Sequence, residues 1–240
     1  MMHTAHPFGA ARPPSESTAM FVPIHDENPL KRIRFPYVNL AIIVINVAVF
    51  LLFQLSDLIA VNECGSMSTF KAFGMIPMEL RGTDVPILAC AGIPRSMPAI
   101  PELATLLSYM FLHGDFWHIL FNMAFLWVFG DNIEDALGHV RFVVFYLLCG
   151  IFAGLTHALL QPASKIPLIG ASGAVAGVVA AYIILHPRVR VWVLVMRFIP
   201  LRLNAMFILG LWIATQFIMI MLPQTDAVAW WAHIGGLVAG

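Results

Sequence analysis

The sequence predicts an all-α membrane protein, and three observations support this fold class. Apolar side chains make up 60% of the 240 residues and charged ones only 11%, whereas an ordinary soluble domain is about 25% charged. Long charge-free windows alternate with short charged segments, and a membrane-spanning helix needs about 20 apolar residues. Lys and Arg gather on alternate sides of these windows, as in multi-pass membrane proteins.

The first segment, residues 1–36, is polar and rich in proline. It lacks the apolar core that a signal peptide needs, so we expect a weakly ordered cytoplasmic tail. The membrane domain then covers residues 37–240. A formal net charge of zero gives no indication of nucleic-acid binding, and three cysteines are too few for a disulfide scaffold.

Six charge-free windows mark the expected helices. They cover residues 35–56, 116–130, 142–164, 166–187, 203–225 and 227–240. The second window reaches spanning length only if it includes the acidic residues after Gly130, and the sixth is cut short at Gly240. We therefore expect a bundle of six transmembrane helices with a truncated last helix.

The distribution of basic residues predicts the orientation. Lys and Arg are concentrated in the tail and in segment 186–202, so we expect both on the cytoplasmic side. Segment 57–112 then forms a long outer loop, which is usually functional or membrane-associated. It contains Cys64 and Cys90, which either form a disulfide in that compartment or stay free.

Four polar side chains from three expected helices fall at one depth below the outer surface: Ser172, His233, His118 and Asn122. The depth follows from a rise of 1.5 Å per helical residue. His118 and Asn122 are four residues apart and so share a helical face. A serine beside a histidine forms a nucleophile and its base, and the N–H groups of His118 and Asn122 suit a developing oxyanion.

Glycines accompany the serine and the second histidine. Gly170 and Gly173 flank the serine, and Gly173 with Gly177 forms a small-residue face on the fourth helix. Gly236 and Gly240 form a similar face on the sixth. Such faces let helix backbones approach closely, which would bring the serine within hydrogen-bond reach of the histidine.

Other interpretations use the same residues. A serine among small residues is also typical of simple helix packing, and intramembrane histidines can form the proton relay of a transporter or channel. Against a transporter, no Asp, Glu, Lys or Arg lies deep in an expected span and no inverted repeat is visible. No zinc-type Cys/His spacing or H-E-x-x-H is present, so we expect no metal and no cofactor. We interpret His157 as a packed or polar-contact histidine.

The chain resembles a known family, the rhomboid intramembrane serine proteases. The resemblance is carried by "HGDFWHILFNM", "FGDNIEDALG", "GASGAVAG" and "AHIGGLVAG", in this order, together with the basic segment before the fifth helix. It implies a six-helix bundle in a multi-pass protein of the lipid bilayer, which we expect to be a bacterial inner membrane. It also implies cleavage of single-span transmembrane substrates near their outer ends.

The resemblance assigns roles to individual residues. Ser172 matches the nucleophile and His233 the base of a dyad without an acidic third member. His118 and Asn122 match the oxyanion-stabilising pair, and Glu134 matches a structural carboxylate at the inner end of the second helix. Where some members carry a tyrosine four residues after the serine, this chain has alanine, so the histidine must be supported from elsewhere.

Overall fold

The computed structural model describes residues 21–55, 69–83, 100–195, 198–221 and 228–240. Its helices are α1 (Tyr37–Val49), α4 (Thr105–Ser108), α5 (Phe116–Phe125), α6 (Asp131–Leu137), α7 (His139–Leu160), α8 (Ser172–Leu185), α9 (Ala205–Met221) and α10 (Trp230–Ala239). Single π-helical turns, η1 (Phe50–Gln54) and η5 (Leu126–Gly130), follow α1 and join α5 to α6. The strands are β1 (Phe21–Asp26), β2 (Arg190–Val195) and β3 (Ile199–Asn204), and short 3-10 turns cover Glu79–Arg81, Glu102–Ala104 and Tyr109–Phe111.

The second expected helix does continue through its acidic residues, because α5, η5 and α6 follow one another without a break. The Asp115 carboxylate caps its start by accepting a hydrogen bond from the His118 backbone N–H at 2.9 Å. Gly138, with φ of 81°, follows its last residue. The cap and the glycine together set the limits of this long helix.

Glu134 on α6 ties the second helix to the first. Its carboxylate accepts hydrogen bonds from the backbone N–H groups of Val38 and Asn39 at 3.1 and 2.7 Å, which would otherwise be unpaired in the first turn of α1. Asn39 in turn donates to the carbonyl of Leu126 at 2.9 Å. A Cβ at Gly130 would collide with the Asn39 amide. The junction therefore depends on polar contacts and on close backbone approach.

Helix α8 forms the centre of the fold, and it is buried from Gly173 through Tyr182. Glycines let its neighbours approach. A Cβ on Gly173 would come within 2.6 Å of the Ala153 Cβ on α7, and a Cβ on Gly236 of α10 would collide with the Gly173 carbonyl. Helix α10 can therefore lie directly on the backbone of α8.

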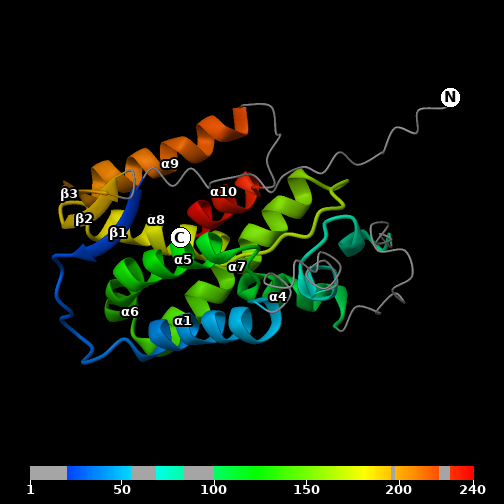
Figure 1. Cartoon of the computed structure of the whole chain (residues 1–240), viewed down its shortest axis with the longest axis horizontal. Helices are drawn as coiled ribbons and strands as arrows, with labels where there is room; N and C mark the ends of the chain where they lie inside the picture. Colours follow the sequence, from blue (N-terminus) through cyan, green and yellow to red (C-terminus); the bar gives the residue numbers. More distant parts are fainter. Residues whose placement is uncertain (1–20, 56–68, 84–99, 196–197, 222–227) are drawn as a thin grey trace.

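The all-α expectation missed a small sheet at one end of the molecule (Figure 1). Its three strands are antiparallel in the order β1-β2-β3, and Arg190 of β2 pairs with Asn204 of β3. The hairpin forms within the basic segment that we interpreted only as a cytoplasmic loop. Val191 and Val193 alternate with more exposed residues and are fully buried, a period of two that is typical of a strand.

The expectation of a weakly ordered tail was wrong for its last part. Phe21 of β1 is 3% exposed, and its ring centroid lies 6.0 Å from that of Phe125 on α5. The Asp26 carboxylate accepts hydrogen bonds from the Tyr182 hydroxyl at 2.5 Å and from Asn132 Nδ2 at 3.0 Å. The tail sequence shows no helical period. Residues 21–26 are ordered because they pair with β2, which follows much later in the chain.

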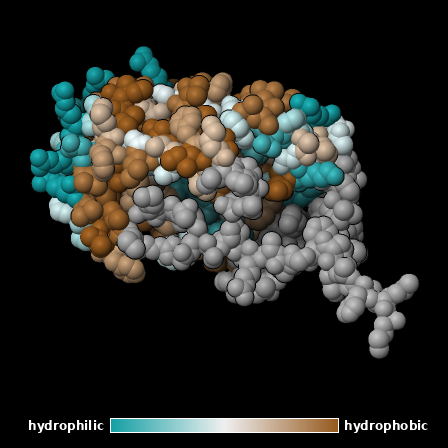
Figure 2. Space-filling view, turned by 90° about the horizontal axis from the view of Figure 1, so that it is seen from above, coloured by the Kyte–Doolittle hydropathy of each residue, from teal (hydrophilic) through white to brown (hydrophobic). Residues whose placement is uncertain are grey.

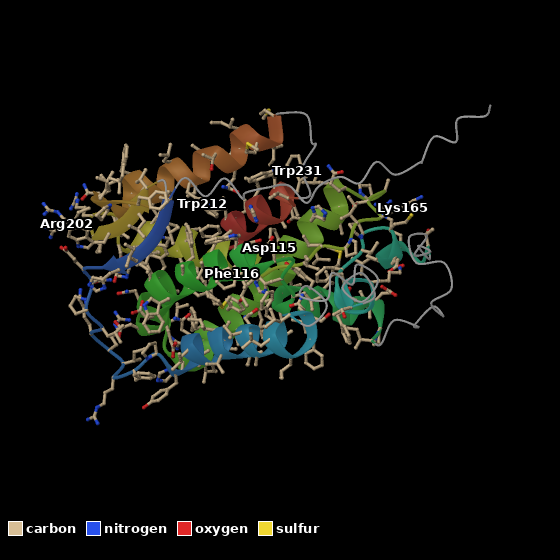
Figure 3. The ribbon with its side chains drawn as sticks, in the orientation of Figure 1. Asp115, Phe116, Lys165, Arg202, Trp212 and Trp231 are labelled. Atoms are coloured by element: carbon tan, nitrogen blue, oxygen red, sulfur yellow. The ribbon has the colours of Figure 1, made fainter. Side chains whose placement is uncertain are left out.

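Two described helices are long and apolar enough to cross a membrane by length and composition, Tyr37–Gln54 and His139–Leu160. Helices α8 and α9 are apolar but shorter. Figure 2 shows hydrophobic side chains over much of one face, with hydrophilic ones gathered towards its ends. Figure 3 places Arg202 at the sheet end and Lys165 at the opposite end. This distribution suits an assembly that lies across an apolar layer.

Candidate active site

Ser172 is presented at the start of α8 by a tight turn. Gly170, two residues earlier, has φ of 115°, a conformation that L side chains rarely adopt. Its N–H donates to the Tyr109 carbonyl at 2.9 Å, which anchors the turn. A Cβ at Gly170 would lie 2.6 Å from the Nε2 atom of His118. Glycine is therefore required here both by the backbone and by the neighbouring imidazole.

His233 on α10 faces the serine. Its Nε2 atom lies 2.8 Å from the Oγ atom of Ser172. Two indole rings flank the imidazole, those of Trp212 and Trp230, with centroid distances of 6.2 and 5.7 Å. The hydroxyl and imidazole that the sequence placed at a common depth thus lie within hydrogen-bond distance of each other.

Gln216 on α9 is a residue of this site that the sequence reasoning missed. It is 2% exposed, and its Oε1 atom lies 2.7 Å from the Nδ1 atom of His233. Its Nε2 atom donates to the Trp212 carbonyl at 3.0 Å and to Thr215 Oγ1 at 3.1 Å. The available signal was a lone amide within the apolar run "AMFILGLWIATQFIMIM", because a buried polar group in such a run needs a partner.

His118 and Asn122 differ in how they lie relative to the serine. The Gly114 N–H points at His118 Nδ1, at 3.4 Å, so the proton of a neutral ring belongs on Nε2. That Nε2 atom faces the backbone of Gly170, beside Ser172. Asn122 instead donates its Nδ2 to the His118 carbonyl at 2.9 Å. In the part of the chain that the structure describes, no hydrogen bond joins Asn122 to the serine.

Helix α7 lies close behind the site. A Cβ on Gly235 of α10 would come within 2.7 Å of Thr156 on α7, and the next residue, His157, interacts electrostatically with His233, as His118 does. The Nδ1 atom of His157 is buried without a hydrogen-bond partner among the described residues. His157, which we interpreted as a packed or polar-contact histidine, therefore lies near the proposed base.

The remaining predicted residues lie outside this cluster. Gly173 and Gly236 form the contact between α8 and α10, and Glu134 lies at the junction with α1. Within the described ranges, no three His, Cys, Asp or Glu side chains come together as a metal site. Cys64 and Cys90 lie outside the described residues, and Cys149 is a buried free thiol.

The sequence is similar to one protein family and to several named relatives. Residues 101–240 match the family described as Rhomboid domain. RHOMBOID-like protein 5 of Arabidopsis thaliana is 27% identical over 191 residues, which cover 75% of this chain and 59% of the relative. Rhomboid-type serine protease 2 of Emericella nidulans is 30% identical over 171 residues, 68% of this chain and 30% of the relative.

A shorter match joins the chain to Rhomboid protein 1, mitochondrial, of Saccharomyces cerevisiae, at 36% identity over 86 residues, 34% of this chain and 25% of the relative. The chain spans about half the length of the first two Arabidopsis relatives, 59% and 52%. The family match itself covers residues 101–240, more than half of the chain. The chain therefore belongs to the rhomboid family of membrane proteins.

Proposed function

We propose that the chain is an intramembrane serine endopeptidase in which Ser172 is the nucleophile and His233 the base. The observation that carries this proposal is the 2.8 Å distance between Ser172 Oγ and His233 Nε2, on two different apolar helices. A lone serine in a membrane helix has no need of an imidazole, whereas a serine nucleophile does, because the hydroxyl must lose its proton to attack.

The geometry supports a complete acyl-transfer cycle. As Ser172 Oγ attacks the scissile carbonyl carbon, its proton passes to His233 Nε2 and the carbonyl oxygen becomes an oxyanion. When the C–N bond breaks, His233 returns the proton to the leaving amine and Ser172 holds the acyl group as an ester. A water molecule then attacks the ester while His233 takes its proton. His233 passes that proton to the departing Ser172 oxygen, which releases the carboxylic acid and restores the free serine.

The oxyanion needs N–H donors near the serine. In our proposal these are the backbone N–H of Ser172, in the first turn of α8, and the Nε2–H of His118. Asn122 serves as a further donor once its amide turns away from the His118 carbonyl. Gly170 keeps this space open, since a Cβ there would meet the His118 ring.

The proposed substrates are single-span transmembrane proteins that are cut near the outer membrane face. In our proposal six helices cross the bilayer, with the sheet and Arg202 on the cytoplasmic side and Lys165 on the outer side (Figure 3). Ser172 at the start of α8 then lies towards the outer side. A bacterial cell membrane is our proposed location, although the relatives named above come from a plant and from fungi.

A fluorophosphonate tests the proposed chemistry directly, because an activated serine oxygen displaces its fluoride and forms a stable phosphonate ester. We expect covalent labelling of the full chain in detergent and none in Ser172→Ala. The same preparations should cut, or fail to cut, a model single-span substrate. A wild-type chain that neither labels nor cuts would contradict the proposal. A transporter is not favoured, because the family match points to a different class of membrane protein.

A further inference from the structure

Gln216 is a buried amide whose hydrogen bonds lead to three neighbours, Trp212, Thr215 and His233. It lies on α9, one turn after Trp212, which Figure 3 labels. Burial of an amide is costly unless its donors and acceptor are paired. Both ends of the Gln216 amide are paired, and one of the partners is His233, the proposed base.

The contacts fix which way the Gln216 amide points. The Trp212 carbonyl oxygen, 3.0 Å from one end of the amide, can only accept a hydrogen bond. The amide nitrogen must therefore lie at that end. The Oε1 atom then faces His233 Nδ1 at 2.7 Å.

This orientation also fixes the proton on the imidazole. An amide oxygen can only accept, so His233 Nδ1 must carry the hydrogen that joins them. A neutral imidazole has one N–H, which leaves Nε2 with its lone pair directed at Ser172 Oγ. We propose that Gln216 is a positioning residue that holds His233 in the tautomer able to accept the serine proton. This inference rests on the function proposed above.

The indole rings beside His233 do not provide the same control. Trp212 and Trp230 lie next to the imidazole and restrict its position. An indole N–H is a donor only, so neither ring can accept from Nδ1. Gln216 also stabilises the imidazolium that forms after proton transfer. The Nδ1–H of the imidazolium still donates to Gln216 Oε1, while its Nε2 proton is transferred to the leaving amine. The working base therefore requires three helices, α8, α9 and α10.

Two substitutions of Gln216 separate positioning from simple packing. Gln216→Met keeps the length of the side chain but removes the acceptor, so we expect kcat to fall on the order of 10- to 100-fold with KM nearly unchanged. Gln216→Glu keeps an oxygen opposite Nδ1, so we expect it to retain most activity. When ionised, the glutamate also stabilises a protonated His233, which moves the acid limb of the kcat profile to higher pH.

Other titratable groups near His233 could also affect the pH profile of kcat, and these are known. Among the described residues, the titratable groups that act on His233 are His118 from α5 and His157 from α7, and neither variant changes them. Gln54→Met is the matched control, because Gln54 is a second buried glutamine, 2% exposed, which donates to the His113 carbonyl at 2.8 Å. It should lower the melting temperature without the change in kcat or in the acid limb.

NMR determines the tautomer of His233 independently of catalytic activity. Histidine ¹⁵N shifts in the full chain, assigned with His233→Gln, should show His233 protonated at Nδ1 at neutral pH. Gln216→Met should reduce this preference. A wild-type kcat in Gln216→Met, or an Nε2-protonated His233 in the unsubstituted chain, would overturn the inference. Absence of labelling and cleavage with the Nδ1–H tautomer intact would instead contradict only the proposed function.

Discussion

The four polar side chains of the proposed site have different roles in the reaction. In the proposed mechanism Ser172 and His233 exchange a proton. One hydrogen bond joins them, so removing either would remove the same reaction step. His118 and Asn122 would only stabilise charge on the oxyanion. His118 already faces the turn that presents the serine, whereas the Asn122 amide is bonded to its own helix.

These roles predict two classes of variant. His118→Ala and Asn122→Ala should each lower kcat by about 10²–10³ and leave measurable cleavage, because one oxyanion donor is lost while the dyad remains. Ser172→Ala and His233→Ala should each cost as much as the double variant. Initial cleavage rates of a model transmembrane substrate in detergent, with melting curves for each variant, provide the measurement.

His157→Ala is the control for these rates. It removes an imidazole that lies near His233 and whose Nδ1 atom has no hydrogen-bond partner among the described residues, and we expect a rate near that of the wild type. A dead His157→Ala beside an active His233→Ala would show that the base was assigned to the wrong histidine.

Between elements, the contact of α8 with α10 decides whether the dyad forms. The Cα of Gly236 lies against the carbonyl of Gly173, so the two helices meet through their backbones. Since Ser172 and His233 come from these two helices, any change in their separation acts on the hydrogen bond between them. Small residues at such crossings are typical of membrane helix packing.

Gly236→Ala should therefore lower both stability and activity. The added Cβ would meet the Gly173 backbone, which cannot move aside as a flexible side chain can, and overpacking of this kind typically costs about 1–3 kcal/mol. Melting temperature and the rate of fluorophosphonate labelling should fall together. Gly210→Ala on α9 is the matched control, because nothing lies within 4 Å of its added Cβ. Equal behaviour of the two alanine variants would contradict the proposed contact.

At the scale of the whole molecule, strand β1 is joined to α8. Asp26 at the end of β1 accepts from Tyr182, which belongs to the serine-bearing helix. Burial raises the pKa of the Asp26 carboxyl above its ordinary value, and the hydrogen bond from Tyr182 opposes that rise only in part. The native protein thus binds this proton more tightly than the unfolded chain does.

The sign of the pH dependence follows from this shift. A raised pKa in the folded state means that the stabilising effect of the protonated Asp26 is present at low pH and is lost as the pH rises above the ordinary value of 3.8 through the folded pKa. Asp26→Asn removes the titration and should flatten the fall in melting temperature over this range, by on the order of a few °C.

Glu27→Gln provides a control of opposite sign. The Arg202 guanidinium beside Glu27 lowers the pKa of that carboxyl, so its contribution is lost as the pH falls. Melting temperatures of the three chains, measured in one detergent across this pH range, test both signs. A profile of Asp26→Asn that is identical to the wild type would contradict the role given to the buried carboxyl.

Orientation in the membrane is also a property of the whole molecule. With Cys64, Cys90 and Cys149 replaced by serine, we expect Lys165→Cys to react with a membrane-impermeant maleimide in intact cells. Arg202→Cys, at the opposite end in Figure 3, should react only after permeabilisation. The reverse pattern would place the N-terminus outside and would contradict the depth assigned to the proposed site. Labelling of each cysteine in detergent confirms that both thiols are accessible.

Much of this protein is determined by local composition. Whether a window can be a membrane helix depends on the transfer free energy of its own side chains. A described helix lies in or overlaps each of the six charge-free windows, and two described helices are long and apolar enough to cross a membrane. Helical rise alone gave Ser172 and His233 a common expected depth. Sequence reasoning could therefore predict the membrane class and name this pair before any contact was known.

Tertiary structure alone decided the contacts between distant segments. The pairing of β1 with β2, the cap that Glu134 places on α1 and the bond from Gln216 to His233 each join residues whose own neighbours give no sign of the partner. The physical reason is that a polar group inside an apolar assembly takes whichever partner the packing brings within about 3 Å, and packing is set by the whole chain.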